Sequence, residues 1–329
     1  MRVVQIYKPG GPEVLELVEL PTPEPGPREV RVRAEVIGVG RADVLVRRGT
    51  YKWMPPLPAI PGAEMVGVID AVGDGVTALC LGQRVLVSAR ELLQRGGCYA
   101  EAICIPEDAG FLLPESIDPV DAASLPNFQF ANALLGCNGG QTHTSILVLG
   151  SAGAVGAALA QQAASRGIQV VGTASTEDKR IYARANGVSA FVSSDPAEMA
   201  AQVMSVTSGR GVDMAFDHLG GDSIVACLHC LAPMGMLVSY NAIQGPPATD
   251  VFQVMRDLLG RSLSLRTFSM HTLDEDRTAR RALMQQAIDD MVSNRIKAPE
   301  PLCFPLDQVR HAHQLLDARN TIGKIVLNP

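Results

Sequence analysis

Apolar runs that break at glycines and resume as helical patterns dominate the middle of the chain. The run 146–149 is wholly apolar, and Gly150, Gly153 and Gly156 follow it at intervals of three before an Ala-rich helical pattern begins. A short apolar run predicts a buried strand, and closely spaced glycines predict a tight turn. Residues 146–160 are therefore expected to form a strand, a turn and a helix, where bare N–H groups can hold a phosphate. The triplet alone is weak evidence, because glycine also marks ordinary turns.

The same alternation continues along the chain to residue 260. Strand-like runs occur at 168–173, 190–193, 212–217 and 236–240, and helical patterns at 176–187, 196–207, 221–232 and 249–260. Residues 262–268 are either a sixth strand or the crossing back to the first domain. Strands that alternate with helices at this spacing predict an α/β domain with a doubly wound parallel sheet. The glycine turn then lies at the carboxyl end of the first strand, where such sheets bind ligands.

Strand patterns prevail nearer the amino terminus, separated by turns rich in Pro and Gly. The strand-like runs are 3–7, 14–19, 30–38, 63–72, 83–87 and 99–105, with a short helical stretch at 42–48. Helical patterns at 119–133, 277–294 and 306–318 and a last strand at 323–328 follow elsewhere. Because one helix and one strand cannot form a core, the tail is expected to rejoin the first domain. The predicted domains are 1–121, 122–265 and a returning part, 266–329.

Composition narrows the class of protein. The chain has 329 residues, enough for two domains, and a net charge of −6 that does not suggest nucleic-acid binding. No apolar run reaches the roughly 18–20 residues of a membrane span, and no signal-like segment opens the chain, so we expect a cytoplasmic protein without a membrane partner. Seven scattered cysteines predict buried thiols rather than disulfides, and Cys227 and Cys230 share a helix face without a second ligand pair.

Two pairs of polar residues are candidates for a functional role. Asp43 and Arg47 lie one helical turn apart, a spacing typical of a structural ion pair. His311 and His313 flank Ala312 and fall on different faces of the expected helix, so surface or rim positions are expected for them.

Ordered motifs along nearly the whole chain resemble the medium-chain dehydrogenase/reductase superfamily, and within it the zinc-free quinone oxidoreductase (zeta-crystallin-like) branch. Besides the glycine turn, they are Gly11-Pro-Glu-Val-Leu15, Pro61-Gly-Ala-Glu-Met-Val-Gly67, Gly97-Cys-Tyr-Ala-Glu101 and Gly323-Lys-Ile-Val-Leu327. The resemblance implies a GroES-like β-barrel catalytic domain built from both chain ends, a Rossmann domain between them, NADPH as cofactor and a homodimer. The apolar run 236–240, expected near the sheet edge, could pair across a two-fold axis.

Zinc members of the superfamily carry Cys and His ligands where this chain has Gly40 and Ala63, and a four-cysteine loop where it has residues 88–97. Without such ligands a tetrahedral zinc site cannot form, so no metal is expected.

The choice of NADPH over NADH can be argued from charge. The second strand of the α/β domain ends Gly172-Thr-Ala-Ser175 with no acidic residue to hold ribose hydroxyls. Ser175 and Lys179 match residues that grip the 2′-phosphate in related reductases, but their tyrosine is replaced by Ser194. Lys179 could instead be an ordinary solvated helix residue, with Arg180 taking its place.

The resemblance places further residues at the cofactor. His218 follows the fourth strand where relatives have a small residue, so it either contacts the nicotinamide side or simply packs. The full predicted cofactor site comprises Gly150, Ser151, Ala152, Gly153, Ala154, Val155, Gly156, Thr173, Ser175, Lys179, Ser194, His218, Leu219, Tyr240 and Asn241.

The catalytic candidate is Tyr51, which matches the proton donor of related 2-enoyl thioester reductases but could equally wall the substrate site. Relatives usually have Asn at Gly40 and Tyr at Leu45, so two polar groups are missing here. Three functions remain open: an NADPH-dependent reductase of a quinone or an α,β-unsaturated carbonyl, a 2-enoyl thioester reductase with Tyr51 as donor, or a low-turnover NADPH-binding structural or sensor protein.

Overall fold

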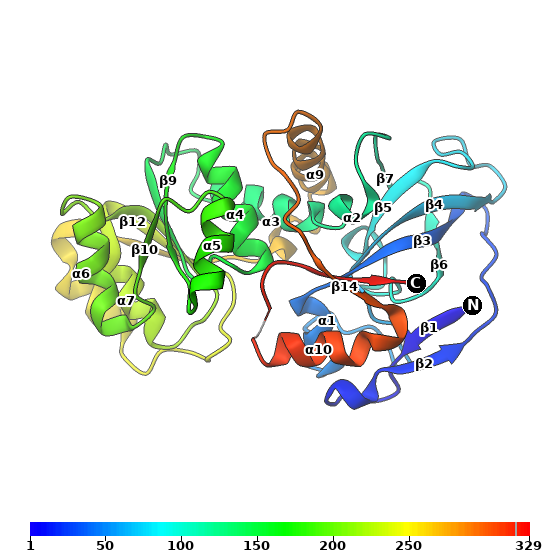
Figure 1. The fold of residues 1–329 in the computed structure, drawn as a ribbon, viewed down its shortest axis with the longest axis horizontal. Helices are drawn as coiled ribbons and strands as arrows, with labels where there is room; N and C mark the ends of the chain where they lie inside the picture. The colour runs from blue at the N-terminus through cyan, green and yellow to red at the C-terminus, as the bar shows by residue number, and fades with distance from the viewer. Residues whose placement is uncertain (320) are drawn as a thin grey trace. The chain divides into compact units, whose positions relative to one another are not determined.

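The computed structural model describes residues 1–319 and 321–329, which fall into two compact units (Figure 1). Unit 1 comprises Met1–Pro126 and Ile288–Pro329, and unit 2 comprises Asn127–Ala287. Among the described residues, none of the helices is long and apolar enough to cross a bilayer.

Unit 1 is built on a seven-stranded, mainly antiparallel sheet. Its strand order is β14-β15-β3-β4-β5-β7, and β6 pairs with β3 beside this path. The strands are β3 (Glu29–Val39), β4 (Glu64–Val72), β5 (Arg84–Ser88), β6 (Ala102–Pro106), β7 (Phe111–Leu112), β14 (Leu302–Pro305) and β15 (Ile325–Asn328). A separate ribbon of β1 (Arg2–Gln5) and β2 (Glu16–Glu19) joins the unit through the bridges Val3↔Ala100 and Ile6↔Ala59.

The long strand β3 organises unit 1 because its residues alternate between the core and the outer face. Val30 and Val32 are fully buried in the main core of the unit, whereas Arg33 is exposed. The amino-terminal half of β3 pairs with β6 and its last residues pair with β15, so β3 joins the carboxyl-terminal strand to the first part of the chain. The return of the carboxyl terminus to the first domain is thus a consequence of strand pairing.

Short helices complete unit 1. They are α1 (Arg41–Arg47), α2 (Pro119–Ala122) and α10 (Val309–Asp317), with 3-10 turns at Pro12–Val14, Ala89–Glu91 and Leu306–Gln308. Helix α1 contacts α10 although more than half of the chain separates them in sequence.

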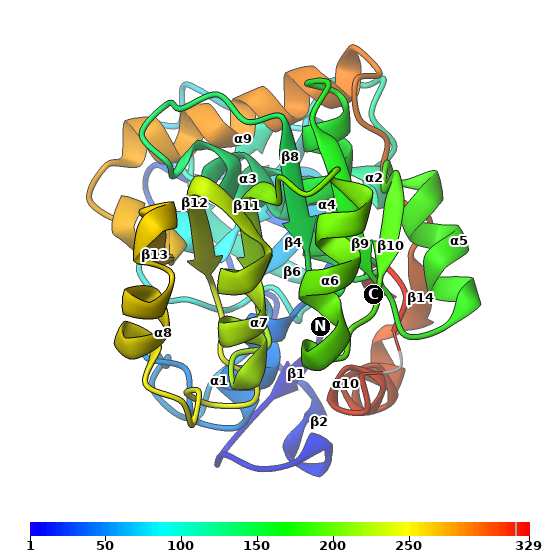
Figure 2. The same cartoon turned by 90° about the vertical axis from the view of Figure 1, so that its left-hand side faces the viewer.

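Unit 2 is a doubly wound domain on a six-stranded sheet of order β10-β9-β8-β11-β12-β13, in which every neighbouring pair is parallel (Figure 2). The strands are β8 (Ser145–Val148), β9 (Gln169–Thr173), β10 (Ala190–Val192), β11 (Val212–Asp217), β12 (Leu231–Ser239) and β13 (Ser264–Thr267). The order reverses between β8 and β11, which makes their carboxyl ends the ligand-binding edge of such a sheet.

Helices cover both faces of the sheet in unit 2. They are α3 (Leu125–Gly136), α4 (Ala154–Ala164), α5 (Glu177–Ala185), α6 (Pro196–Val206), α7 (Asp222–Cys230), α8 (Val251–Asp257) and α9 (Arg277–Val292), with 3-10 turns at Leu259–Arg261 and Met270–Leu273. Helix α4 packs on β8 and β9, and α7 packs on β11 and β12. Helix α7 also contacts α6 and α8. Cys227 and Cys230 are buried on α7 as expected, but Cys80 and Cys303 are exposed, so the prediction of buried thiols is wrong for these two.

The division into units differs from the predicted boundaries, mainly at the second crossing. Residues 266–287 belong to unit 2 instead of the returning part. The buried Gln129 side chain of α3 donates to the carbonyl of Arg280 in α9 at 2.8 Å, and the Arg280 guanidinium donates to the carbonyls of Leu273 and Asp274. The bond between Gln129 and Arg280 joins residues 151 positions apart and ties α9 to unit 2, and no local sequence pattern encodes it.

The run 236–240 lies near the sheet edge, as predicted, but it does not form a free edge. Strand β12 is covered on both sides, because β11 and β13 pair with it. The edge strand on this side of the sheet is β13, and all four of its residues are exposed. Only Leu265 is apolar in the strand Ser264-Leu-Arg-Thr267, so its strand signal is weaker than that of the apolar run before it.

Candidate cofactor and acceptor sites

The glycine turn of unit 2 has the conformation that its sequence predicts. Gly150 has a φ of +61°, which favours glycine, and a Cβ on Gly156 would lie 2.6 Å from the Gly150 carbonyl oxygen. The turn closes with the Gly153 N–H donating to that same oxygen at 3.0 Å. The three glycines therefore allow the chain to turn sharply after β8 and allow α4 to begin close against that turn.

Residue Thr173 at the end of β9 holds this turn in place. Its hydroxyl accepts a hydrogen bond from the Gly150 N–H at 3.0 Å, and its carbonyl accepts from both the N–H and the hydroxyl of Ser151 at 3.0 Å. Ser151 and Ala152, the two central residues of the turn, are buried. Of the predicted cofactor residues, Thr173 and Ser151 thus have a clear supporting role for the loop.

The amino terminus of α4 is built to receive an anion. Its N-cap is Gly153, which has no side chain to cap the first N–H groups, and Ala154, Val155 and Gly156 form the first turn. The first N–H groups of a helix have no partner within the helix and carry partial positive charge. A bare glycine turn followed by this helix end fits the pyrophosphate of a dinucleotide.

Ser175 and Lys179 lie together just beyond β9. The ammonium of Lys179 donates to the Ser175 hydroxyl at 3.3 Å, and Thr176 caps α5 by accepting from the Lys179 N–H. Arg180, the predicted substitute, is engaged with Glu177 at 3.8 Å. The structure therefore brings a cation and a hydroxyl together at a position suited to a phosphate, while Ser194 is exposed after β10.

The carboxyl end of β11 forms a rigid turn around a buried carboxylate. Asp217 is fully buried and accepts from the N–H groups of Leu219 and Gly220 and from the Ser223 hydroxyl, at 3.1, 2.9 and 2.8 Å. This turn fixes the backbone of Leu219 and of His218 beside it. Sequence reasoning placed a strand end here but missed the role of Asp217, although a buried Asp at a strand end is a turn signal.

His218 lies against the glycine turn and against Tyr240. A Cβ on Gly150 would meet the His218 ring at 2.5 Å, and the His218 and Tyr240 rings stack with centroids 5.9 Å apart. Phe130 meets Tyr240 edge-on at 5.6 Å. Asn241 follows, with its side-chain oxygen accepting from the Ala242 N–H at 2.9 Å. His218, after β11, thus adjoins the turn after β8, and Tyr240, after β12, stacks on His218.

The edge of unit 2 at the carboxyl ends of its strands has the groups that a dinucleotide needs. The turns after β8, β9, β10, β11 and β12 all lie at one edge because the strands are parallel. At that edge stand a cradle that Cβ atoms would fill, an uncapped helix terminus and a lysine–hydroxyl pair. The cradle and the helix terminus fit a pyrophosphate, and the lysine–hydroxyl pair fits a 2′-phosphate.

In unit 1, Tyr51 follows α1 and is half buried against the core. The Thr50 and Tyr51 N–H groups both donate to the Leu45 carbonyl, at 3.0 and 3.2 Å, which ties the segment to the end of α1. The Tyr51 ring lies 5.8 Å from that of Trp53. Tyr51 is therefore anchored but accessible.

A carboxylate joins Gly40 and Ala63, the two positions that correspond to zinc ligands in the zinc enzymes that the sequence resembles. Asp43 is 1% exposed and accepts from the backbone N–H of Gly40 at 2.8 Å, from the N–H of Ala63 and from the Tyr99 hydroxyl. Burial raises the pKa of Asp43 to about 6, against the opposing effect of these hydrogen bonds. No group of three or more His, Cys, Asp or Glu side chains suited to a metal occurs in the described part of the chain.

Next to Asp43 is a buried ion pair between Lys324, which directly precedes β15, and Glu64 of β4. Burial lowers the pKa of Lys324 to about 8, and the nearby Asp43 opposes that shift. A Cβ on Gly38 would clash with the Glu64 side chain, so the glycine makes room for the pair.

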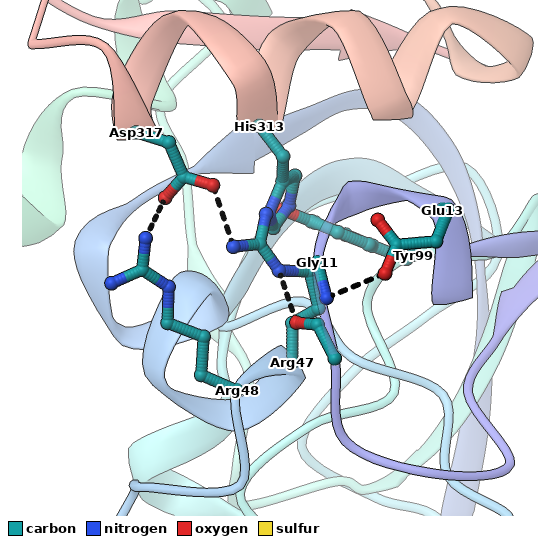
Figure 3. A network of polar contacts seen from close by, with 8 residues as sticks. Gly11, Glu13, Arg47, Arg48, Tyr99, His313 and Asp317 are labelled. Carbon is teal, nitrogen blue, oxygen red and sulfur yellow. Dashed lines mark hydrogen bonds and ion pairs between the residues drawn. The ribbon is translucent and has the colours of Figure 1, made fainter.

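A line of buried side chains, Tyr99, His313 and Arg47, leads from Asp43 to α10. Figure 3 shows these three side chains together with Asp317 of α10. The Tyr99 hydroxyl lies 3.0 Å from His313 Nε2, and Arg47 Nη1 lies 3.4 Å from His313 Nδ1. Arg47 also donates to the Asp317 carboxylate at 2.7 Å and to the Gly10 carbonyl at 3.2 Å.

The direction of every proton in this line can be assigned. An ionised Asp43 only accepts, so the Tyr99 hydroxyl donates to it, and His313 Nε2–H must then donate to the Tyr99 oxygen. His313 Nδ1 is left as the acceptor for Arg47, which keeps the imidazole neutral. Burial, reinforced by Arg47, lowers the pKa of His313 to about 3, in agreement with that assignment.

Two expectations from the sequence are wrong here. Arg47 pairs with Asp317 rather than with Asp43, because α10 brings a carboxylate to the buried guanidinium. His313 is fully buried instead of lying at the surface, whereas His311 is exposed. A signal was present: residue 313 falls on the apolar face that Val309, Ala312 and Leu316 define.

Comparison with known proteins gives matches over both units. Residues 26–115 match the family described as "Alcohol dehydrogenase GroES-like domain", and residues 154–288 match "Zinc-binding dehydrogenase". The chain is 32% identical to a quinone oxidoreductase of Pseudomonas aeruginosa and 30% identical to a 2-haloacrylate reductase of a Burkholderia species, with 99% and 98% of each chain covered.

Solved structures agree with these relatives. The mycobacterial protein Rv1454c, solved in complex with NADPH, is 30% identical, superposes with a TM-score of 0.89 and is covered over the full length of both chains. The NADPH-bound quinone oxidoreductase of Escherichia coli gives a TM-score of 0.88 at 26% identity, again over both full chains. The two-domain architecture, with one GroES-like and one Rossmann-like unit, is therefore shared with these proteins.

Proposed function

Because the chain belongs to the zinc-free quinone oxidoreductase branch of the medium-chain dehydrogenase/reductase superfamily, we propose that it is an NADPH-dependent reductase of a quinone or an α,β-unsaturated carbonyl. The observation that carries this proposal is the edge of unit 2, where the glycine cradle adjoins the Ser175–Lys179 pair. The NADPH held by two structural relatives supports the choice of cofactor.

When bound, the cofactor supplies a hydride from C4 of its nicotinamide ring. The residues of this chain have three tasks in that reaction. The α4 terminus holds the pyrophosphate, Lys179 and Ser175 hold the 2′-phosphate, and the His218–Leu219 turn supports the nicotinamide half. Precise orientation of the reacting atoms and exclusion of water are the main contributions of a protein to hydride transfer.

The two acceptor classes differ in their need for a protein acid. A quinone that accepts hydride can take its proton from water, whereas an enone or enoyl thioester gains from a positioned donor at the α-carbon or carbonyl oxygen. Tyr51 is the candidate donor, because a neutral phenol is protonated at working pH. The quinone oxidoreductase and 2-haloacrylate reductase relatives support the two classes respectively.

Steady-state turnover tests the proposal. NADPH and NADH oxidation would be followed with a quinone, an enone and an enoyl thioester. We expect turnover with NADPH on at least one acceptor and a clear preference over NADH. Tight NADPH binding without turnover on any acceptor would favour a structural or sensor protein instead. This alternative is retained because Gly40 lacks the polar side chain that relatives usually have at its position.

Replacing Tyr51 by Phe separates the acceptor classes. The variant should lose about 10²–10⁴-fold in kcat/KM for an enone or enoyl thioester, the usual contribution of a general acid, and little for a quinone. Tyr7→Phe is the matched control, because Tyr7 is an exposed phenol of unit 1 whose hydroxyl donates to the Gln5 side chain. An equal, small loss on both acceptors would mean that Tyr51 merely lines the site.

A homodimer and a cytoplasmic location complete the proposal. The exposed edge of β13 offers unpaired backbone groups, and pairing with a second copy would cover them.

A further inference from the structure

The chain has one tryptophan, Trp53, and it stands beside the proposed catalytic tyrosine. Its side chain is 36% exposed, and its ring lies 5.8 Å from that of Tyr51 at an interplanar angle of 56°. Tyr51 and Met54, on either side in sequence, both pack against the core of unit 1. The indole is therefore held by anchored neighbours while a large part of it remains accessible.

A cation accompanies this ring. The ammonium of Lys52 lies 5.2 Å from the centroid of Trp53, within the range of a cation–π contact. Residues 51–53 thus present a phenol, a positive charge on a long side chain and an indole within three consecutive positions. The indole can stack on a planar, electron-poor ligand, and the ammonium can stabilise negative charge that develops on it.

A quinone is such a ligand. Its flat conjugated ring can stack in an offset arrangement on the electron-rich indole, whereas a small aliphatic enone offers no aromatic ring. A quinone that gains one hydride with its electron pair becomes a hydroquinone anion, with NADP⁺ as the oxidised product, and one proton from water completes the hydroquinone. The Lys52 ammonium would offset the charge of that anion as it forms.

We propose that Trp53 and Lys52 form an acceptor subsite that selects aromatic quinones over small aliphatic enones. This inference rests on the proposed function and narrows its substrate class. Trp53 determines specificity by stacking on the acceptor, and Lys52 stabilises the reduced product. The subsite lies wholly within unit 1.

The single tryptophan makes the binding test direct. Its emission would be titrated with 1,4-naphthoquinone and, separately, with cyclohex-2-enone in the absence of cofactor, with free N-acetyltryptophanamide as the correction for absorption by the ligand. Saturable quenching by the naphthoquinone at concentrations that do not quench the free amide supports the subsite. Purely linear quenching equal to that of the free amide overturns it.

Variants test selectivity in the complete enzyme. Trp53→Ala should lower kcat/KM for 1,4-naphthoquinone about three- to tenfold, mainly through KM, and leave that for cyclohex-2-enone within about twofold. Trp53→Phe should recover most of the loss, and Lys52→Met should lower kcat on the quinone without weakening its binding. Tyr7→Ala is the matched control, since it removes another exposed aromatic ring of unit 1.

The outcomes separate the two proposals. If the wild type turns over but Trp53→Ala lowers kcat/KM equally for both acceptors, or for neither, the proposed subsite is wrong and the reductase assignment stands. Failure of the wild-type protein to oxidise NADPH with any acceptor overturns the reductase assignment, and the subsite with it.

Discussion

Replacement of His313 by Gln should change how the stability of unit 1 depends on pH. His313 is fully buried, and the groups that face it are Arg47, Tyr99 and, farther along, Asp317. Its pKa is lowered to about 3 in the folded chain, while an unfolded chain binds the proton with a pKa near 6.5. Between these values the unfolded state holds more protons, so stability rises with pH and is lost as pH falls below about 6.5.

The size of the effect follows from those two values. A pH of 5 lies about 1.5 units below the pKa of the imidazole in the unfolded chain, which corresponds to a loss of roughly 2 kcal/mol in the free energy of unfolding. At pH 7 the loss is close to zero. The glutamine side chain of the His313→Gln variant would offer one N–H donor and one oxygen acceptor in the same sense but would not titrate. The substitution costs about 1–2 kcal/mol at pH 7 for altered hydrogen bonds.

The assay is urea unfolding of the wild type and His313→Gln at pH 7 and pH 5, followed by Trp53 emission, because the only tryptophan lies in unit 1. The stability advantage of the wild type should shrink by about 2 kcal/mol between the two pH values. Protonation of Asp43, whose pKa of about 6 lies above its ordinary value, acts in the opposite direction but is common to both proteins.

His311→Gln is the matched control, because His311 is an exposed histidine on the same helix. The reasoning is refuted if the wild type and His313→Gln lose stability in parallel as the pH falls.

Three further predictions concern the cofactor, metals and assembly. Lys179→Ala should weaken NADPH binding by about 1–2 kcal/mol in calorimetry and leave NADH nearly unchanged, since one charge-assisted contact to the 2′-phosphate is lost; equal losses for both would remove Lys179 from that role. Dialysis against a chelator should leave the Tm and activity unchanged, and stoichiometric zinc found by elemental analysis would contradict this. Light scattering at micromolar concentration should give a dimer mass, and a monomer mass would remove the proposed pairing through β13.

Unit 2 shows what a sequence can predict about a fold. The strand, turn and helix around Gly150–Gly156 arise from local patterns, because a buried apolar run, three spaced glycines and an Ala-rich helix each act within a few residues. The parallel order then follows from alternation and right-handed crossovers. The predicted residues after successive strands therefore come to one edge.

The polar line of unit 1 shows where such prediction ends. His313 and Tyr99 are 214 positions apart, and His313 and Arg47 are 266 apart. Local spacing paired Arg47 with Asp43, which is the natural choice within one helix. Only the packing of α10 on α1 supplies Asp317 as the partner and buries His313. The edge position of β13 and the attachment of α9 to unit 2 depend on long-range contacts in the same way.

The most direct test of the central claim is an anaerobic single-turnover experiment. Enzyme in excess would be mixed with one equivalent of NADPH and one of 1,4-naphthoquinone, and absorbance at the nicotinamide band followed beside a protein-free control. The account predicts loss of one NADPH per quinone reduced, at a rate far above the control and far above that with NADH. Decay at the control rate with this quinone, and equally with an enone and an enoyl thioester, would contradict it.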